Sequence, residues 1–195
     1  TNKYIVYLDN DRGTENFSLY KLDVENMDIT ILTPDKNAKV GIIHCNRELF
    51  PDELIFSLYT DKMTVADLYR VNLNSNESTL IEKNPGNVAA WLIDNNFRAS
   101  GIISVKDNGK TELSVRIAGE NGQKEKTVWT MEDKFSSYPL CFSGDNKYIY
   151  ISDGQTYETV RIIKIEIKTG KAEVIAFNET YDLCINVFNH NVSPY

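Results

Sequence analysis

Histidine and serine are the residue types in this sequence that could support hydrolysis, but their positions do not pair them. The two histidines are His44, in an apolar run, and His190, in a polar tail. A serine nucleophile needs a histidine within hydrogen-bond reach, and the sequence places no serine near either one. We interpret both as core or surface histidines and predict no catalytic residue in this chain.

An acidic turn is the second feature that could do chemistry. Asp9, Asp11 and Glu15 offer oxygen ligands of the kind that Ca²⁺ prefers, but their spacing is not that of an EF-hand loop. We interpret the segment as a turn solvated by its own carboxylates, with Asp9 or Asn10 bonded to nearby backbone. No Cys and His cluster at zinc-site spacing exists in the sequence, so we predict no metal and no cofactor.

Three cysteines complete the reactive residues. Cys45, Cys141 and Cys184 lie far apart, and an odd number cannot pair completely within one chain. Each stands in an apolar run, where a free thiol behaves as a small buried hydrophobic group. A disulfide framework is therefore not expected.

The overall charge limits the partners. A formal net charge of −7 argues against nucleic acid, which needs clustered Lys and Arg on one face. Residues 1–20 lack the charged-then-apolar order of a signal peptide, and no stretch approaches the roughly 18 apolar residues of a membrane-spanning helix. We predict no nucleic-acid partner, no membrane partner and a cytoplasmic location, with periplasmic and secreted locations kept open.

The elements that position these residues are β-strands. Residues 3–8 and 147–151 are short runs of β-branched and aromatic residues closed by Asp or Asn, and helical periodicity is almost absent. Turn residues recur between such runs, as at 107–109, 144–146 and 168–170. The pattern predicts antiparallel hairpins in series.

A repeat organises these hairpins. Lys21, Arg70, Arg116 and Lys164 lie in similar strand–turn–strand phrases, with spacings of about 49, 46 and 48 residues. Propeller blades of four antiparallel strands have repeats of this length. Residues 88–130, for example, offer four strand-like runs. Each period is therefore interpreted as one blade.

The predicted fold class is all-β, a β-propeller fragment of about three complete four-stranded antiparallel blades plus parts of two more. We expect a single propeller region over residues 1–195, with blades at about 3–33 (partial), 40–83, 88–130, 136–177 and 181–195 (partial). Because propellers close with roughly four to eight blades, this stretch is expected to belong to a larger ring. Its open ends should expose apolar faces and edge strands, so we also expect self-association.

Specific motifs resemble a known family. Residues 9–20 are similar to the Asp-x-x-Gly-Asp-Glu-Asn-aromatic-x-Leu-Tyr signature of the prolyl oligopeptidase family, in its acylaminoacyl-peptidase-like branch, with Thr14 in place of Asp. Residues 67–73 and 82–88 resemble the next blade of that propeller. Residues 142–150 resemble the Phe-Ser-Pro-Asp-Gly-Lys hairpin of these propellers and of TolB-like relatives, with Gly144 and Asn146 replacing Pro and Gly.

The resemblance implies a function. In that family of S9 serine peptidases, an α/β-hydrolase domain carries a Ser-Asp-His triad on a Gly-x-Ser-x-Gly elbow, a pattern that this sequence lacks. The resemblance implies a non-catalytic propeller, a scaffold and substrate-size gate, whose partners are the parent protein's hydrolase domain and peptide substrates. The alternatives are a stand-alone TolB-like propeller that binds proteins and a propeller that is itself catalytic through its channel.

Aromatic residues divide between core and rim in this interpretation. Trp91 and Trp129 alternate with smaller residues, as side chains that pack between sheets do. Phe135, Tyr138 and Tyr157 are candidates for rim positions that contact a peptide or the hydrolase domain.

Overall fold

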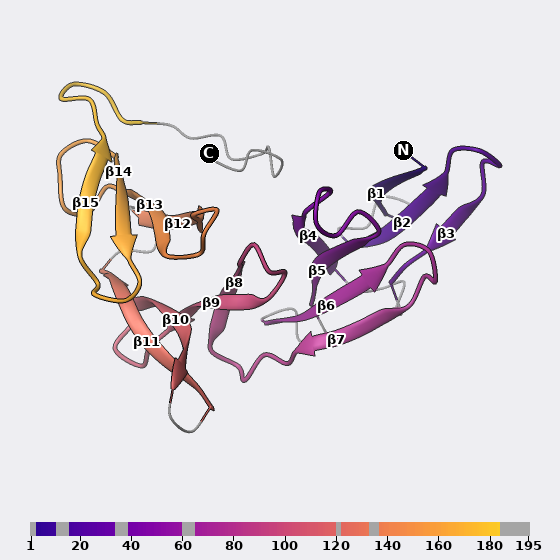
Figure 1. Cartoon of the computed structure of the whole chain (residues 1–195), viewed down its shortest axis with the longest axis horizontal. Coiled ribbons are helices and arrows are strands. Elements are labelled where there is room, and N and C mark those ends of the chain that lie inside the picture. The colour runs from indigo at the N-terminus through magenta and orange to yellow at the C-terminus, as the bar shows by residue number, and fades with distance from the viewer. Residues whose placement is uncertain are drawn as a thin grey trace. The chain divides into compact units, whose positions relative to one another are not determined.

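A computed structural model describes most of the chain: residues 3–10, 16–33, 39–59, 65–119, 122–132 and 137–183. Every regular element in this part is a β-strand, and the strands form four antiparallel sheets (Figure 1). The all-β prediction is confirmed. Across these ranges no helix is long and apolar enough to cross a membrane.

The first two sheets lie in one compact unit, Thr1–Gly86. The first sheet has three strands: β1 (Tyr4–Asn10), β2 (Phe17–Asp23) and β3 (Ile29–Ile31). The second sheet has four strands: β4 (Lys39–Cys45), β5 (Glu53–Tyr59), β6 (Ala66–Asn72) and β7 (Ser78–Glu82). Strand order follows chain order in both sheets, so each is a simple meander.

The other two sheets lie in a second compact unit, Asn87–Tyr195. The third sheet comprises β8 (Val88–Ile93), β9 (Ala99–Val105), β10 (Thr111–Gly119) and β11 (Gly122–Met131). The fourth sheet comprises β12 (Ser137–Phe142), β13 (Tyr148–Asp153), β14 (Arg161–Glu166) and β15 (Ala172–Ala176). Both are again meanders of four strands.

Three four-stranded sheets and one three-stranded sheet agree with the predicted blade composition. Lys21, Arg70, Arg116 and Lys164 lie on β2, β6, β10 and β14, which are corresponding strands of the four sheets. The predicted fifth, partial blade was expected from residue 181. Residues 181–183 form no strand, and residues 184–195 lie outside the described part.

Each four-stranded meander has two kinds of end. We call the end with the first–second and third–fourth connections the turn end. We call the other the loop end, which carries the second–third connection and the link to the next sheet. Left-handed backbone occurs at the turn end at Met27, Asn76, Phe97, Asn146 and Gly170, and at the loop end at Gly109. Asn146 occupies the position where the similar family hairpin has Gly, and its φ of 57° lies in the left-handed region that favours Gly and Asn.

The first and second sheets share one hydrophobic core. Leu19 of β2 is fully buried against side chains of β5 and β6, including Phe56 and Val71. Tyr4 and Val6 of β1 pack against the same core. Because alternate strand residues point to opposite faces, this face of the first sheet is covered by the second sheet.

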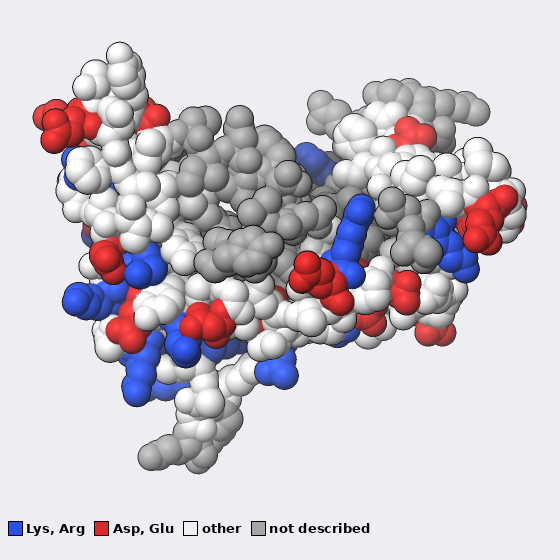
Figure 2. Space-filling model, turned by 45° about the horizontal axis from the view of Figure 1, so that its top comes forward, with Lys and Arg blue, Asp and Glu red and all other residues white. Residues whose placement is uncertain are grey.

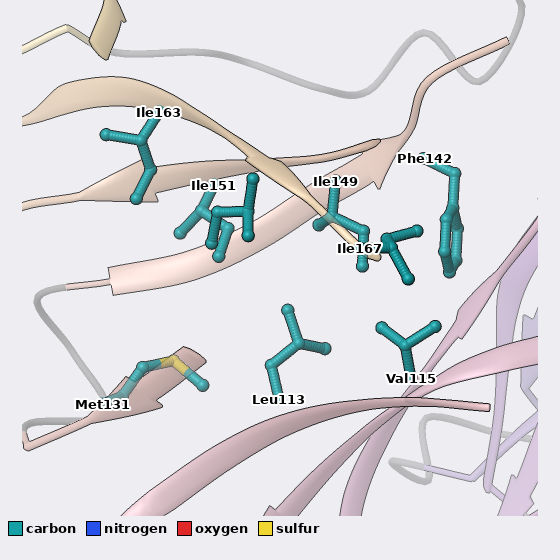
Figure 3. Packing of buried hydrophobic residues seen from close by; sticks show 9 residues of the cluster. Leu113, Val115, Met131, Phe142, Ile149, Ile151, Ile163 and Ile167 are labelled. Atoms are coloured by element: carbon teal, nitrogen blue, oxygen red, sulfur yellow. The ribbon is translucent and has the colours of Figure 1, made fainter. Parts of the chain in front are cut away.

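The third and fourth sheets share a second core. Figure 3 shows Leu113 and Val115 of β10 directed toward Ile149, Ile167 and other side chains of the fourth sheet. The β-branched residues of β13 and β14 that suggested strands from the sequence are the ones that fill this interface. Nearly complete burial makes this packing the main stabilising feature of the unit.

The surface carries both signs of charge. Figure 2 shows Lys and Arg side chains interleaved with Asp and Glu over the face in view. Ion pairs also form between neighbouring strands, such as those of Lys164 with Glu173 and Arg70 with Glu53. The described residues of this face thus form no broad basic surface of the kind that binds a phosphate backbone.

Candidate functional site

The loop end of the fourth sheet carries an arginine stacked between two exposed aromatic rings. Arg161, the first residue of β14, has its guanidinium carbon 3.9 Å from the ring centroid of Tyr157 and 4.8 Å from that of Phe177. Tyr157 is 37% exposed and Phe177 54% exposed. Cation–π contacts of this kind orient a guanidinium without neutralising it. We call Tyr157, Arg161 and Phe177 the Arg161 cluster.

The connection that carries Tyr157 is anchored by Gln155. The Gln155 amide donates from Nε2 to the carbonyl of Thr130 (2.9 Å), and its Oε1 accepts from the backbone N–H of Glu132 (3.0 Å). Both partners lie at the end of the third sheet. The β13–β14 connection is thus tied to the neighbouring sheet within the same unit, which fixes the position from which Tyr157 meets Arg161.

The segment that carries Phe177 is anchored by hydrogen bonds to the residues just before β14. Thr159 donates its hydroxyl to the carbonyl of Asn178 (2.7 Å), and Asp182 accepts from the backbone N–H of Val160 (2.7 Å). Leu183 in turn donates to the Val160 carbonyl (3.1 Å). The chain after β15 is therefore bound alongside the start of β14, next to Arg161.

A buried polar pair lies beside the cluster. Asp153 is 0% exposed; its Oδ1 accepts from the Ser137 hydroxyl (2.8 Å) and from the backbone N–H of Gln155 (3.2 Å). Asp153 and Arg161 are paired positions on β13 and β14. Among the described groups, Asp153 Oδ2 and Arg161 Nε are buried without a hydrogen-bond partner. Buried polar atoms left in this way are the kind that an ordered water or a ligand group satisfies.

This arrangement is suited to binding. It presents a cation and flat apolar rings, which suit recognition of peptide groups. The Arg161 cluster is therefore interpreted as a contact surface. Within the described ranges, no group of three or more His, Cys, Asp and Glu residues could hold a metal ion.

The three aromatic residues predicted at the rim, Phe135, Tyr138 and Tyr157, do not form one group in the structure. Tyr157 belongs to the Arg161 cluster. Tyr138 lies on β12, is half-exposed and pairs with Ser152, so it lies on the opposite face of the sheet from Asp153. Phe135 lies outside the described residues.

Arg161 and Phe177 were not identified from the sequence. An arginine at the start of a strand, soon after a loop aromatic, is a weak signal because charged residues commonly begin strands. Phe177 follows a different strand, and only the pairing of β14 with β15 brings it to Arg161.

Of the two histidines weighed for hydrolysis, the structure describes one. His44 lies on β4 in the other unit, and His190 lies outside the described residues. The Ser143 hydroxyl donates to Asp145 (2.7 Å) and accepts from the backbone N–H of Tyr148 (3.0 Å) in the β12–β13 turn. These bonds give Ser143 a structural role in a tight turn.

The pKa of Asp145 in that turn is lowered by its hydrogen-bond partners. The Ser143 hydroxyl and the Lys147 ammonium lower the pKa of Asp145 to about 2. Lys147 forms an ion pair with Asp145 at 2.9 Å. The carboxylate thus stays charged under ordinary conditions and holds the turn together.

The acidic turn and the cysteines are described in part. Asp9 accepts from the backbone N–H of Asn10 (2.8 Å), as the sequence predicted, while Asp11 and Glu15 lie outside the described residues. Cys45 and Cys141 are free thiols. Burial raises the pKa of the Cys141 thiol, which keeps it protonated and poorly nucleophilic. Cys184 lies outside the described residues.

Comparison with known proteins relates the chain to peptidases and propellers. Dipeptidyl aminopeptidase BIII of Pseudoxanthomonas mexicana is 24% identical over 172 residues, which are 88% of this chain and 24% of that protein. TolB from Acinetobacter baumannii superposes with a TM-score of 0.60 at 12% identity, covering 90% of this chain and 42% of that chain. The β-propeller domain of the Trilobed protease from Pyrococcus furiosus gives a TM-score of 0.51 at 13% identity, covering 89% and 53%. No protein-family model matches the chain.

These matches confirm the β-propeller fold and the resemblance to the propellers of S9-type peptidases and TolB-like proteins. The chain spans about a quarter of the length of the peptidase relative. The likeness to the solved structures concerns the fold.

Proposed function

We propose that this chain is part of the propeller domain of an S9-type serine peptidase, in which it serves as a scaffold and substrate-size gate. The observation that carries the proposal is the sequence match to a dipeptidyl aminopeptidase over 88% of the chain. In this proposal the hydrolysis is performed by an α/β-hydrolase domain of the parent protein, because the present sequence has no Gly-x-Ser-x-Gly pattern.

The packing supports a gating role in physical terms. Sheets that share cores as closely packed as those around Phe56 and Ile149 form stiff walls, since protein interiors resist compression. A wall of this kind excludes substrates by size and not by chemistry. Recognition would then fall to exposed groups at the loop end, of which the Arg161 cluster is the best defined.

The experiment that tests the peptidase assignment uses the full-length product of the gene. A fluorophosphonate probe, which labels an activated serine, is expected to label the full-length protein and not the 195-residue chain. An unlabelled full-length protein, with no nucleophile elbow in its sequence, would contradict the assignment.

A second experiment addresses recognition. In the unlabelled full-length protein, Arg161→Met is expected to lower kcat/KM for peptides severalfold, and in a separate assay to leave the rate of fluorophosphonate labelling unchanged. Arg98→Met, in the β8–β9 turn at the turn end, is the matched control. Equal effects of the two variants on peptide cleavage would remove the Arg161 cluster from the recognition role and leave the peptidase assignment intact.

The alternative function is a stand-alone TolB-like propeller that binds proteins, which the superposition on TolB favours. The same labelling experiment separates the two. A gene that adds further blades and ends without a nucleophile elbow, together with no labelling, would support the binding module.

A further inference from the structure

Arg161 is fixed in position, but its guanidinium has no hydrogen-bond acceptor. Tyr157 and Phe177 lie over it, and its backbone belongs to β14. No described residue accepts a hydrogen bond from its nitrogens, and no described carboxylate forms an ion pair with it. A guanidinium offers five N–H donors, so the capacity of Arg161 to bind an acceptor is unused within the described part of the chain.

Other stacked cations on the third strands of the four-stranded sheets have a carboxylate partner. Arg70 on β6, Arg116 on β10 and Lys164 on β14 each lie over an aromatic ring. Each also forms an ion pair with a glutamate of a neighbouring strand, in the same order Glu53, Glu125 and Glu173. Arg161 lies over two rings and lacks the ion pair. The Arg161 cluster therefore contains every part of this recurring arrangement except the carboxylate.

Two carboxylates of the chain lie close by but are held by other donors. Asp153 occupies the paired position on β13 and lies on the same face of the sheet as Arg161, yet its Oδ1 is bound by a hydroxyl and a backbone N–H. Asp182 accepts from the backbone N–H of Val160 through its own Oδ1. Neither residue forms an ion pair with Arg161, so neither supplies the carboxylate that the other stacked cations have.

The donors that a ligand can reach are the terminal nitrogens of Arg161. Its Nε is buried without a partner, whereas Nη1 and Nη2 are not among the buried unpartnered atoms of the described residues. Tyr157 and Phe177 are themselves exposed, so the cluster is accessible from solvent. Rings over the face of a guanidinium leave its edge, where the N–H groups lie, open to a planar acceptor.

A carboxylate matches these two nitrogens in shape and charge. Its two oxygens can accept parallel N–H bonds from Nη1 and Nη2, which is the bidentate geometry in which arginine binds carboxylates. A neutral amide offers one oxygen and no charge, and hydrogen bonds between a charged and a neutral group are weaker than those between two opposite charges. The geometry of the cluster therefore favours an acidic ligand group over an amide.

The charges around the cluster favour a ligand with a single negative charge. Asp153 is buried at the position paired with Arg161, and Glu158, Glu179 and Asp182 are exposed on the segments that carry the two rings. Residues 153–160 and 176–183 contain no lysine and no arginine. A phosphate dianion would meet one cation among several carboxylates, whereas one cation balances a carboxylate.

We infer that the Arg161 cluster binds a carboxylate group, carried by an acidic side chain or the C-terminus of a peptide, or by a small carboxylic acid. The carboxylate oxygens accept from Nη1 and Nη2 of Arg161, while Tyr157 and Phe177 hold the guanidinium in place and contact the apolar atoms of the ligand. As a recognition role for this cluster, the inference rests on the proposed function. Its test measures binding to the chain itself, so the two can fail separately.

The first test is an NMR titration of the ¹⁵N-labelled 195-residue chain. The side-chain Nε–H signal of Arg161 is identified as the one that Arg161→Lys removes. The probes are acetyl-Ala-Glu-Ala-amide and its neutral counterpart acetyl-Ala-Gln-Ala-amide. The Glu peptide is expected to shift the Arg161 signal with a Kd roughly tenfold or more below that of the Gln peptide, because only its hydrogen bonds join two opposite charges. Equal Kd values for the two peptides overturn the inference.

Two further probes identify the source and charge of the ligand group. Sodium acetate that binds as tightly as the Glu peptide would assign the site to small carboxylic acids, and weaker binding of acetate would assign it to peptides. A phosphoserine peptide that binds about tenfold more tightly than the Glu peptide would contradict a site for a single negative charge.

The second test compares variants, with backbone N–H signals around Tyr157 and Phe177 as the readout. Arg161→Met is expected to abolish the preference for the Glu peptide over the Gln peptide. Arg161→Lys keeps the charge but loses the planar fork, so it should weaken binding of the Glu peptide severalfold. Arg98→Met, exposed in the β8–β9 turn, is the matched control and should bind like the parent.

Thermal unfolding of each variant shows whether it is folded. If Arg161→Met does not fold, Arg161→Lys carries the test, and a Kd equal to that of the parent overturns the inference. A preference for the Glu peptide that persists in folded Arg161→Met overturns it as well. Failure of fluorophosphonate labelling in the full-length protein would remove the peptidase assignment alone, whereas failure of peptide binding would remove the carboxylate site alone.

Discussion

Ile5 and Ile149 are the same residue type at the same place in the repeat, yet their surroundings differ completely. Each follows the tyrosine that begins its strand, Ile5 on β1 and Ile149 on β13. Each also pairs with the next strand of its sheet, Ile5 with Leu22 and Ile149 with Ile165. Ile149 is 0% exposed because the third sheet covers it, whereas Ile5 is 51% exposed. Burial of a residue at this place in the repeat therefore depends on the packing of the neighbouring sheet and not on residue type alone.

The largest expected loss of stability comes from truncating Ile149, the buried member of this pair. Ile149→Ala should lower the free energy of unfolding by about 2–5 kcal/mol, because it leaves a cavity in a closely packed core. Ile5→Ala should change it by less than about 0.5 kcal/mol. Urea denaturation of dilute protein measures both, and similar losses for the two variants would contradict the comparison.

The next largest expected loss of stability comes from replacing the buried Lys21, compared with replacing the partly exposed Lys164. Lys21→Met should cost roughly 1.5–3 kcal/mol, because it removes charged hydrogen bonds and leaves the buried Leu73 carbonyl without its donor. Lys164→Met, at the equivalent but partly exposed position, should cost less than about 1 kcal/mol in dilute protein. Thermal and urea unfolding provide the measurement, and an equal cost would mean that the Lys21 contact adds nothing.

A smaller change in stability is expected from substitutions in the third–fourth turns, where the left-handed backbone at Met27 and Gly170 is a local feature of the turn. Gly170→Ala should cost about 1–2 kcal/mol: the added Cβ meets no atom within 4 Å, but φ is +80°. Met27→Gly should instead stabilise by roughly 0.5–1 kcal/mol, since relief of strain exceeds the entropy that glycine loses on folding. Unfolding experiments that gave both changes the same sign would contradict a shared turn geometry.

The smallest effect is a pH dependence in the β12–β13 turn. Because the pKa of Asp145 is lowered to about 2 in the folded chain, below the value of about 3.9 for unfolded aspartate, its contribution to stability is present above pH about 4. That contribution is lost as the pH falls toward 2. An NMR titration of the Asp145 carboxyl checks this, and Asp145→Asn should flatten the acid limb. A carboxyl that titrates near pH 4 would show that the turn contacts are absent in solution.

The local features of this protein could be predicted from its amino-acid sequence. Runs such as 147–151 became strands, and Asp, Asn and Gly became turns, because backbone preferences act within a few residues. The spacing of Lys21, Arg70, Arg116 and Lys164 was enough to predict the repeat, since each blade is built from the same local units. Among the candidate contact residues, Tyr157 was identifiable as an aromatic residue in a connection.

Which faces are covered and which residues meet depends on how the sheets pack. Ile5 and Ile149 look alike in sequence, and the presence of a neighbouring sheet separates them. Arg161 meets Phe177 because β14 pairs with β15, and Lys21 reaches Leu73 because one sheet packs on another. These are contacts between segments distant in the chain, and burial and hydrogen bonding there depend on the packed arrangement, which local preferences do not encode.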